Sequence, residues 1–169
     1  QGRAKLAAEE HPSEHLDQVI RAHDRMEALI DDLLRLTLAG ERVEEREPID
    51  PSVFGDAWWK NVDTREATLR VNVERRIRAD PNRLQQLFEN LVRNAIEHGG
   101  NDVRVTVGEL ADGFCVEDDG QGIPPDERDD VLEAGYSTAD EGTGIGLRIV
   151  AQVVEAHGWE LDLTEGAEG

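Results

Sequence analysis

The sequence has little cysteine and no long apolar run. Its one cysteine, Cys115, excludes an internal disulfide and a cysteine-rich metal cluster, so a reducing cytoplasm is the expected compartment. No segment reaches membrane-spanning length and no signal-peptide pattern opens the chain, so we expect no membrane contact. Because the chain begins at Gln1 rather than at a methionine, we expect a longer parent protein, either soluble or membrane-associated.

Basic residues are also scarce. The chain has 38 acidic against 18 basic residues, a formal net charge of −20, and its only lysines are Lys5 and Lys60. Such a chain would repel nucleic acid phosphates, so DNA and RNA are poor candidate partners. A heavily carboxylated surface suits concentrated salt, where self-repulsion is screened. We therefore hypothesise a halophilic protein, with a merely acidic protein as the alternative.

A long amphipathic helix is predicted from Glu14 to Ala39, after a possible helix end at residues 1–10 and a break at Pro12. One short hairpin cannot bury so broad an apolar stripe, so a homodimer through residues 1–39 is expected. The stripe consists of Leu16, Val19, His23, Met26, Ile30, Leu33 and Thr37, widened by Ala22, Leu29 and Leu36.

Residues 1–40 are thus predicted to be part of a helical hairpin, followed by a charged linker at 41–48 and a mixed α/β domain at 49–169. With 38% hydrophobic residues, the chain has enough apolar content for one mid-sized core. In chain order, the domain is expected to contain a helix from about Pro51 through Trp59, strands at 68–73 and 75–78, a helix at 81–97 capped by Asp80, strands at 101–109 and 113–117, a helix at 145–157 and a strand at 160–164.

Two glycine clusters follow the predicted strand at 113–117. Asp118 stands just beyond this strand, where we expect a buried carboxylate that points into a cleft and accepts a hydrogen bond from the exocyclic amine of adenine. Gly120 and Gly122 leave room for a ring against the backbone. The second cluster, GTGIGL at 142–147, opens a helix whose free amides suit a phosphate. Neither cluster is specific on its own, and a DxGxG turn by itself is more often a surface turn than a binding site.

The third element is a pair of asparagines on the helix at 81–97. Asn90 and Asn94 are four residues apart and so share a face, beside Glu89, Glu97 and His98. Their carboxamide oxygens could complete a magnesium shell supplied mainly by phosphates and waters. The alternative is an ordinary solvated helix face.

Together, NLVRNAIEH (90–98), DDGQGI (118–123) and GTGIGL (142–147) resemble the N, G1 and G2 boxes of sensor histidine kinases. The resemblance extends beyond these boxes. It includes the run RADPNRLQQLFENLVRNA, which leads into the N box, and AHGWELDL, which follows the G2 box. MEALIDDLLRL, within the helix at 14–39, looks like the second helix of the family's dimerisation and histidine phosphotransfer hairpin.

This resemblance implies an α+β, Bergerat-type sandwich with helices on one face of a mixed sheet, ATP and Mg²⁺ as cofactors, and a response regulator receiver domain as partner. It implies a lid at 124–141, adenine binding at Asp118, and Mg²⁺ binding by Asn94 helped by Asn90. The implied ATP-binding residues are Asn90, Asn94, His98, Asp118, Gly120, Gly122, Ile123, Gly142, Thr143, Gly144, Ile145, Gly146 and Leu147.

The implied activity is transfer of the γ-phosphoryl group of ATP to a histidine, then to a response regulator aspartate. Related gyrase-type ATPases place a glutamate at the position of Asn90; an amide cannot act as a base at neutral pH, which favours transfer over hydrolysis. His23 is followed by Asp24 but lacks the family's proline, so the acceptor is expected upstream of Gln1 and the chain alone is not expected to autophosphorylate. An ATPase, an anti-sigma-type serine kinase and a degenerate nucleotide-binding or dimerisation module remain alternatives, the last because Glu97 stands where many members have a basic residue.

Overall fold

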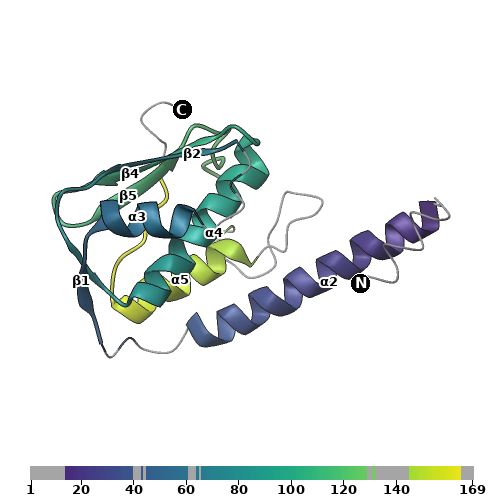
Figure 1. Ribbon diagram of the computed structural model, residues 1–169, viewed down its shortest axis with the longest axis horizontal. Helices are drawn as coiled ribbons and strands as arrows, with labels where there is room; N and C mark the ends of the chain where they lie inside the picture. Colours follow the sequence, from purple (N-terminus) through teal and green to yellow (C-terminus); the bar gives the residue numbers. More distant parts are fainter. Residues whose placement is uncertain are drawn as a thin grey trace.

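The computed structural model describes residues 14–39, 43, 45–60, 64, 66–128, 131 and 145–164. Figure 1 shows helices on one side of the three-stranded sheet, with the long helix at 14–39 projecting away from this body. The mixed α/β class expected from the sequence is confirmed. The elements are, in chain order, α2 (Glu14–Ala39), β1 (Glu47–Ile49), α3 (Pro51–Trp59), β2 (Thr68–Asn72), β3 (Ile77–Ala79), α4 (Pro81–Gly99), β4 (Arg104–Glu109), β5 (Phe114–Asp118) and α5 (Gly146–His157).

The long helix α2 has the predicted bounds, and it packs against α5. Most of its apolar stripe is exposed. The exposed fraction is 58% for Val19, 55% for Met26, 59% for Ile30 and 53% for Leu33. Leu29, by contrast, packs against the core. Within the described residues, no helix is both long enough and apolar enough to cross a membrane.

The main sheet has the strand order β2-β4-β5, with β2 parallel to β4 and β4 antiparallel to β5. The predicted hairpin turn lies between β4 and β5, where the Leu110 N–H donates to the Gly113 carbonyl at 3.0 Å. A second, two-stranded antiparallel sheet pairs β1 with β3. Because β1 includes Glu47 and Pro48, ordered pairing begins inside the segment that was predicted to be linker.

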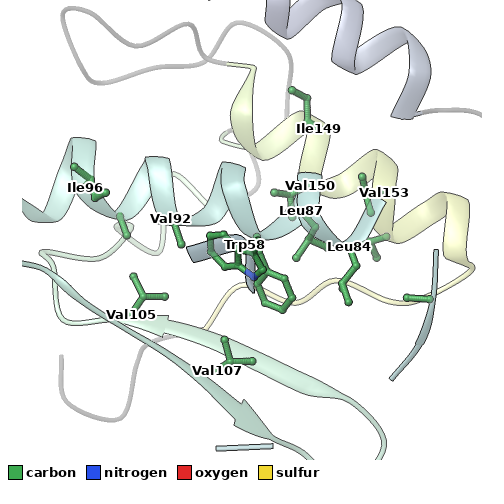
Figure 2. Close-up of a cluster of buried hydrophobic side chains, with 14 of the residues drawn as sticks. Trp58, Leu84, Leu87, Val92, Ile96, Val105, Val107, Ile149, Val150 and Val153 are labelled. Carbon is green, nitrogen blue, oxygen red and sulfur yellow. The ribbon is translucent and has the colours of Figure 1, made fainter. Parts of the chain in front are cut away.

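The core lies between the helices and the main sheet. Val105 and Val107 on β4 alternate with less buried residues and face the helices. Trp58 of α3 lies between them and α4 (Figure 2), and its ring stacks on Phe88 with centroids 5.8 Å apart. Ile149 of α5 is fully buried, so α4 and α5 share this core.

Local capping signals account for both helices near the candidate site. Asp80 precedes α4, and its carboxylate accepts a hydrogen bond from the Arg83 N–H at 3.0 Å. Helix α5 ends at Gly158, whose φ of +64° is the left-handed conformation that favours glycine. The helices predicted at 81–97 and 145–157 are therefore confirmed, with shifts of one or two residues at their ends.

Two predicted strands are wrong in whole or in part. The strand expected at 75–78 is found at Ile77–Ala79, because the backbone N–H groups of Glu74 and Arg75 donate to the Glu109 carboxylate rather than to a strand. Residues 160–164 are not a strand. Just before them, Trp159 packs its ring edge-on against Phe114, so this segment contributes side chains to the core without joining a sheet.

Candidate functional site

Helix α4 brings parts of all three motifs together. Its two asparagines lie one turn apart, and its C-terminal end lies beside the first glycine cluster. The start of α5, which belongs to the second cluster, lies against Asn94. Segments more than fifty residues apart in the sequence thus meet along one helix.

Asn90 is buried, with an exposed fraction of 2%. Its Nδ2 donates to the Gln86 carbonyl at 2.7 Å, and its Oδ1 accepts a hydrogen bond from the Arg93 guanidinium at 2.8 Å. The two bonds agree on the orientation of the amide, because its donor faces a carbonyl and its acceptor faces a cation. Asn90 is therefore fixed by its own helix, and its oxygen points at Arg93.

Asn94 faces the first residue of α5. A Cβ atom added to Gly146 would lie 2.9 Å from the Asn94 Oδ1, closer than side chains tolerate. Glycine at position 146 therefore lets the asparagine carboxamide lie directly against the helix start. The N-cap residue of α5, Ile145, has no side-chain group that could cap the helix, so among the described residues no N-cap side chain bonds the first amides of α5.

The first glycine cluster lies against the C-terminal end of α4, beyond Asn94. A Cβ atom on Gly120 would lie 2.8 Å from the Gly99 Cα and 2.7 Å from the Asp118 Oδ1. Such a Cβ would meet backbone, which cannot move aside as the end of a flexible side chain can. Gly120 thus permits a close approach between this turn and α4. Gly99 is not among the predicted site residues, although the consecutive glycines 99 and 100 mark the helix end.

The prediction that Asp118 is buried is wrong. Asp118 is the last residue of β5 rather than the residue after it, and its side chain is exposed. Its Oδ1 accepts a hydrogen bond from the Gly120 N–H at 3.0 Å, which folds the carboxylate back over its own turn. Its neighbour Asp119 accepts from the Arg104 N–H at 2.7 Å and fastens the end of β5 to the start of β4.

The remainder of the first cluster leads away from the sheet. Gly122 has a φ of +68°, so the turn requires a residue that tolerates the left-handed region. Gln121 donates from Nε2 to the His98 carbonyl at 3.4 Å, while the His98 side chain is exposed. Ile123 is half-buried, and its carbonyl accepts from the Arg128 Nε at 3.2 Å.

The second cluster is only partly described. Ile145 is buried and precedes α5, and Leu147 is half-buried in its first turn. The predicted phosphate ligands Gly142, Thr143 and Gly144 lie outside the described residues, as does most of the predicted lid at 124–141. Of that lid, residues 124–128 and 131 are described, and they contain a turn in which the Glu127 N–H donates to the Pro124 carbonyl at 3.0 Å.

A buried histidine joins α5 to the start of α4. The Nε2 of His157 accepts a hydrogen bond from the Asp80 N–H at 3.1 Å, and its Nδ1 lies 2.8 Å from the Val153 carbonyl. Because a carbonyl only accepts, Nδ1 must hold the proton and the ring is neutral. Burial lowers the pKa of His157, with the nearby Arg46 and Arg83 acting in the same direction. This contact helps to fix the angle between the two helices that meet at the site.

The residues present suit a magnesium ion only as a supplement to other ligands. Within the described residues, no group of three or more His, Cys, Asp or Glu could hold a metal ion. Two amide oxygens cannot fill an octahedral shell, so phosphate oxygens and waters would have to supply the rest. The Asn90 oxygen is also engaged by Arg93. Asn94 is therefore the better placed of the two predicted ligands.

Comparison with protein families matches residues 79–169 to the family described as histidine kinase-, DNA gyrase B-, and HSP90-like ATPases. The sensor histidine kinase ZraS of Salmonella typhi is 33% identical over 93% of this chain. The sensor histidine kinase CpxA of Escherichia coli is 26% identical over 94%. These alignments cover 37% and 38% of the two relatives, so the chain spans just over a third of their length.

Solved structures agree with this relationship. A mycobacterial sensor histidine kinase, MprB, is 31% identical and superposes with a TM-score of 0.56 over 67% of this chain and 80% of its own. The histidine kinase AdeS of Acinetobacter baumannii has a TM-score of 0.60 over 92% of this chain and 81% of its own. At 19% identity, the latter likeness shows the fold alone.

Proposed function

The chain belongs to the family of histidine kinase-, DNA gyrase B-, and HSP90-like ATPases, and from this premise we propose that it is the ATP-binding catalytic part of a sensor histidine kinase. Its parent would transfer the γ-phosphoryl group of ATP to a histidine and then to an aspartate of a response regulator receiver domain. The observation that best supports the proposal is the meeting of the three motifs on α4, through Asn94 with Gly146 and Gly99 with Gly120.

We assign adenine binding to the turn at Asp118. For this role the carboxylate would have to leave its hydrogen bond with the Gly120 N–H and turn toward the base. A carboxylate accepts from the exocyclic amine of adenine, whereas the corresponding carbonyl of guanine offers no donor. Gly120 and Gly122 would line the base pocket, with Ile123 beside them and His98 at its margin.

The phosphates belong, in this proposal, at the start of α5. The backbone amides of the first turn, which the side chain of Ile145 does not cap, and the positive end of the helix dipole favour an anion there. Ile145 and Leu147 would border this region, with Gly142, Thr143 and Gly144 before them. Asn94, which lies against Gly146, would contribute a carboxamide oxygen to a magnesium ion held mainly by the phosphates.

Catalysis would consist of positioning and charge neutralisation. Magnesium bound to ATP would offset the negative charge that the phosphoryl group spreads over its oxygens. The protein's own residues would orient the phosphates toward the acceptor histidine. Asn90 offers an amide and no carboxylate, so this position provides no general base for water. We therefore favour phosphoryl transfer over ATP hydrolysis.

The exposed stripe on α2 supports a homodimer. Apolar side chains spaced at three and four residues, each more than half exposed, make a helix surface suited to a coiled-coil or four-helix-bundle partner. We propose residues 1–40 as part of the dimerisation hairpin and the rest, from the start of β1, as the catalytic domain. A cytoplasmic location and adaptation to high salt complete the proposal; the net charge of −20 supports the latter.

A phosphotransfer assay tests the function directly. The chain is mixed with a separately expressed upstream segment that contains the candidate acceptor histidine, together with Mg²⁺ and ATP labelled at the γ position. We expect acid-labile, base-stable label on the upstream segment, and none when Asn94→Ala replaces the wild-type chain. Label on serine, or release of phosphate without labelled protein, would overturn the proposed activity.

A further inference from the structure

Arg93 lies between the two asparagines of α4, and none of the roles assigned above uses it. It is half-buried, and its guanidinium donates to the Asn90 Oδ1 at 2.8 Å. The other end of the Asn90 amide is fixed by the Gln86 carbonyl at 2.7 Å. In this arrangement the Asn90 oxygen is both inaccessible, with the residue 2% exposed, and bonded to a cation.

A metal ion cannot use that oxygen while Arg93 stays in place. A magnesium–oxygen bond is about 2.0–2.1 Å long, so with the guanidinium at 2.8 Å from the same oxygen the two cations would be less than about 5 Å apart. Such close like charges repel strongly in a site partly shielded from water. Metal binding at Asn90 therefore requires the guanidinium to move.

An anion is the natural destination for the displaced guanidinium. Arginine binds phosphate through hydrogen bonds that are often bidentate and that join two opposite full charges, an attraction that a neutral amide oxygen does not offer. Phosphates held at the start of α5 would lie against Asn94, the residue that follows Arg93 in the same helix turn. Exchange of an amide partner for a phosphate partner would thus be favourable, and it would uncover the Asn90 oxygen.

We propose that Arg93 is a positioning residue that covers the Asn90 oxygen and releases it to a metal ion only when nucleotide phosphates take over the guanidinium. The inference rests on the proposed nucleotide site and adds a coupling to it: the metal and the nucleotide bind better together than either does alone, and Arg93 supplies part of that preference. By linkage, the coupling works equally in both directions.

The test compares metal binding with and without nucleotide in Arg93→Ala, Arg93→Gln and the wild-type chain. Mn²⁺ replaces Mg²⁺, because the paramagnetic resonance of free Mn²⁺ reports binding without any enzymatic activity. Titrations use Mn²⁺ alone, ADP alone, and ADP with saturating Mn²⁺. Arg70→Ala is the charge-matched control, since Arg70 is exposed on β2 in the sheet, outside the proposed site. Circular dichroism verifies folding, and Arg93→Gln retains a polar side chain if the alanine variant fails to fold.

We expect both Arg93 variants to bind Mn²⁺ alone several-fold more tightly than the wild-type chain does. Their affinity for ADP in the presence of Mn²⁺ should fall by about tenfold or more, the loss expected for one charge-assisted hydrogen bond. Arg70→Ala should change neither the affinity for Mn²⁺ alone nor the affinity for ADP in the presence of Mn²⁺. Unchanged or weakened binding of Mn²⁺ alone in both variants would overturn the role of Arg93. Failure of the wild-type chain to bind ADP would instead refute the proposed nucleotide site, while the comparison with Mn²⁺ alone still decides whether Arg93 covers a metal ligand.

Discussion

Acidification should destabilise the fold through His157, the buried histidine that joins α5 to the start of α4. The side chain is 1% exposed, its Nε2 accepts from the Asp80 N–H, and its ring stacks on Trp159 with centroids 4.3 Å apart. A proton on Nε2 would turn this acceptor into a donor facing another donor. The folded state therefore favours the neutral ring, in agreement with the lowered pKa that burial causes.

The direction and size of the effect follow from linkage. The unfolded chain binds the proton more readily, because its histidine titrates near the ordinary pKa of about 6.5. The stabilisation is complete above that pH and is lost as the pH falls through 6.5 toward the lower pKa of the folded state. Between pH 7.5 and 5.5, the free energy of unfolding should fall by up to about 1.4 kcal/mol through this one group.

Urea unfolding at constant ionic strength, followed by tryptophan fluorescence, measures the loss. His157→Phe is the matched variant, because it keeps an aromatic ring beside Trp159 and removes the titrating group. At pH 7.5 the variant should be less stable by about 1–2 kcal/mol, since the partly buried Asp80 N–H loses its acceptor. Its stability should then depend less steeply on pH than that of the wild-type chain. If the free energy of unfolding falls equally steeply with pH in the variant and in the wild-type chain, the role of His157 is refuted.

Four further predictions concern other parts of the structure. Gly146→Ala should weaken ATP binding measured by calorimetry while circular dichroism stays unchanged, because the new Cβ would displace the Asn94 carboxamide; unaltered affinity would contradict that contact. Phe88→Ala should lower the free energy of unfolding by about 3–5 kcal/mol, because Phe88 is buried among the core rings, and a loss below about 1 kcal/mol would contradict this packing. Leu33→Asp should shift the chain toward the monomer in sedimentation analysis if α2 forms the dimer surface, and an unchanged mass would exclude that surface. Raising the salt concentration from low to molar should raise the melting temperature if the acidic surface is adapted to salt, whereas a flat response would point to an ordinary acidic protein.

Local signals in the sequence were sufficient to predict where the helices begin and end. The Asp80–Pro81 pair marks the start of α4, and the glycine at 158 marks the end of α5, because capping depends only on neighbouring residues. The positions of the short strands were harder to predict from the sequence. Strand β3 begins two residues later than predicted, because the Glu109 carboxylate, distant in sequence, binds the preceding backbone amides.

In the candidate site, too, the features set by local sequence could be predicted and those set by distant residues could not. Helical spacing alone placed Asn90 and Asn94 on one side of α4. Spacing could not show that the Asn90 oxygen faces Arg93, nor that Gly99 adjoins Gly120, since these depend on rotamers and on tertiary approach. Asp118 was expected to be buried because a carboxylate at a strand end often faces a cleft. In the structure it instead binds the amide of its own turn and stays exposed.

The central claim is that the three motifs form one nucleotide site along α4. Residue-resolved amide NMR of the labelled chain, titrated with ADP and Mg²⁺, tests it most directly. We predict that the amide signals of Asn94, Gly120 and Gly146 shift together, with one common saturation curve. Shifts confined to one of the motifs, or no shift in any of them at saturating nucleotide, would contradict the account.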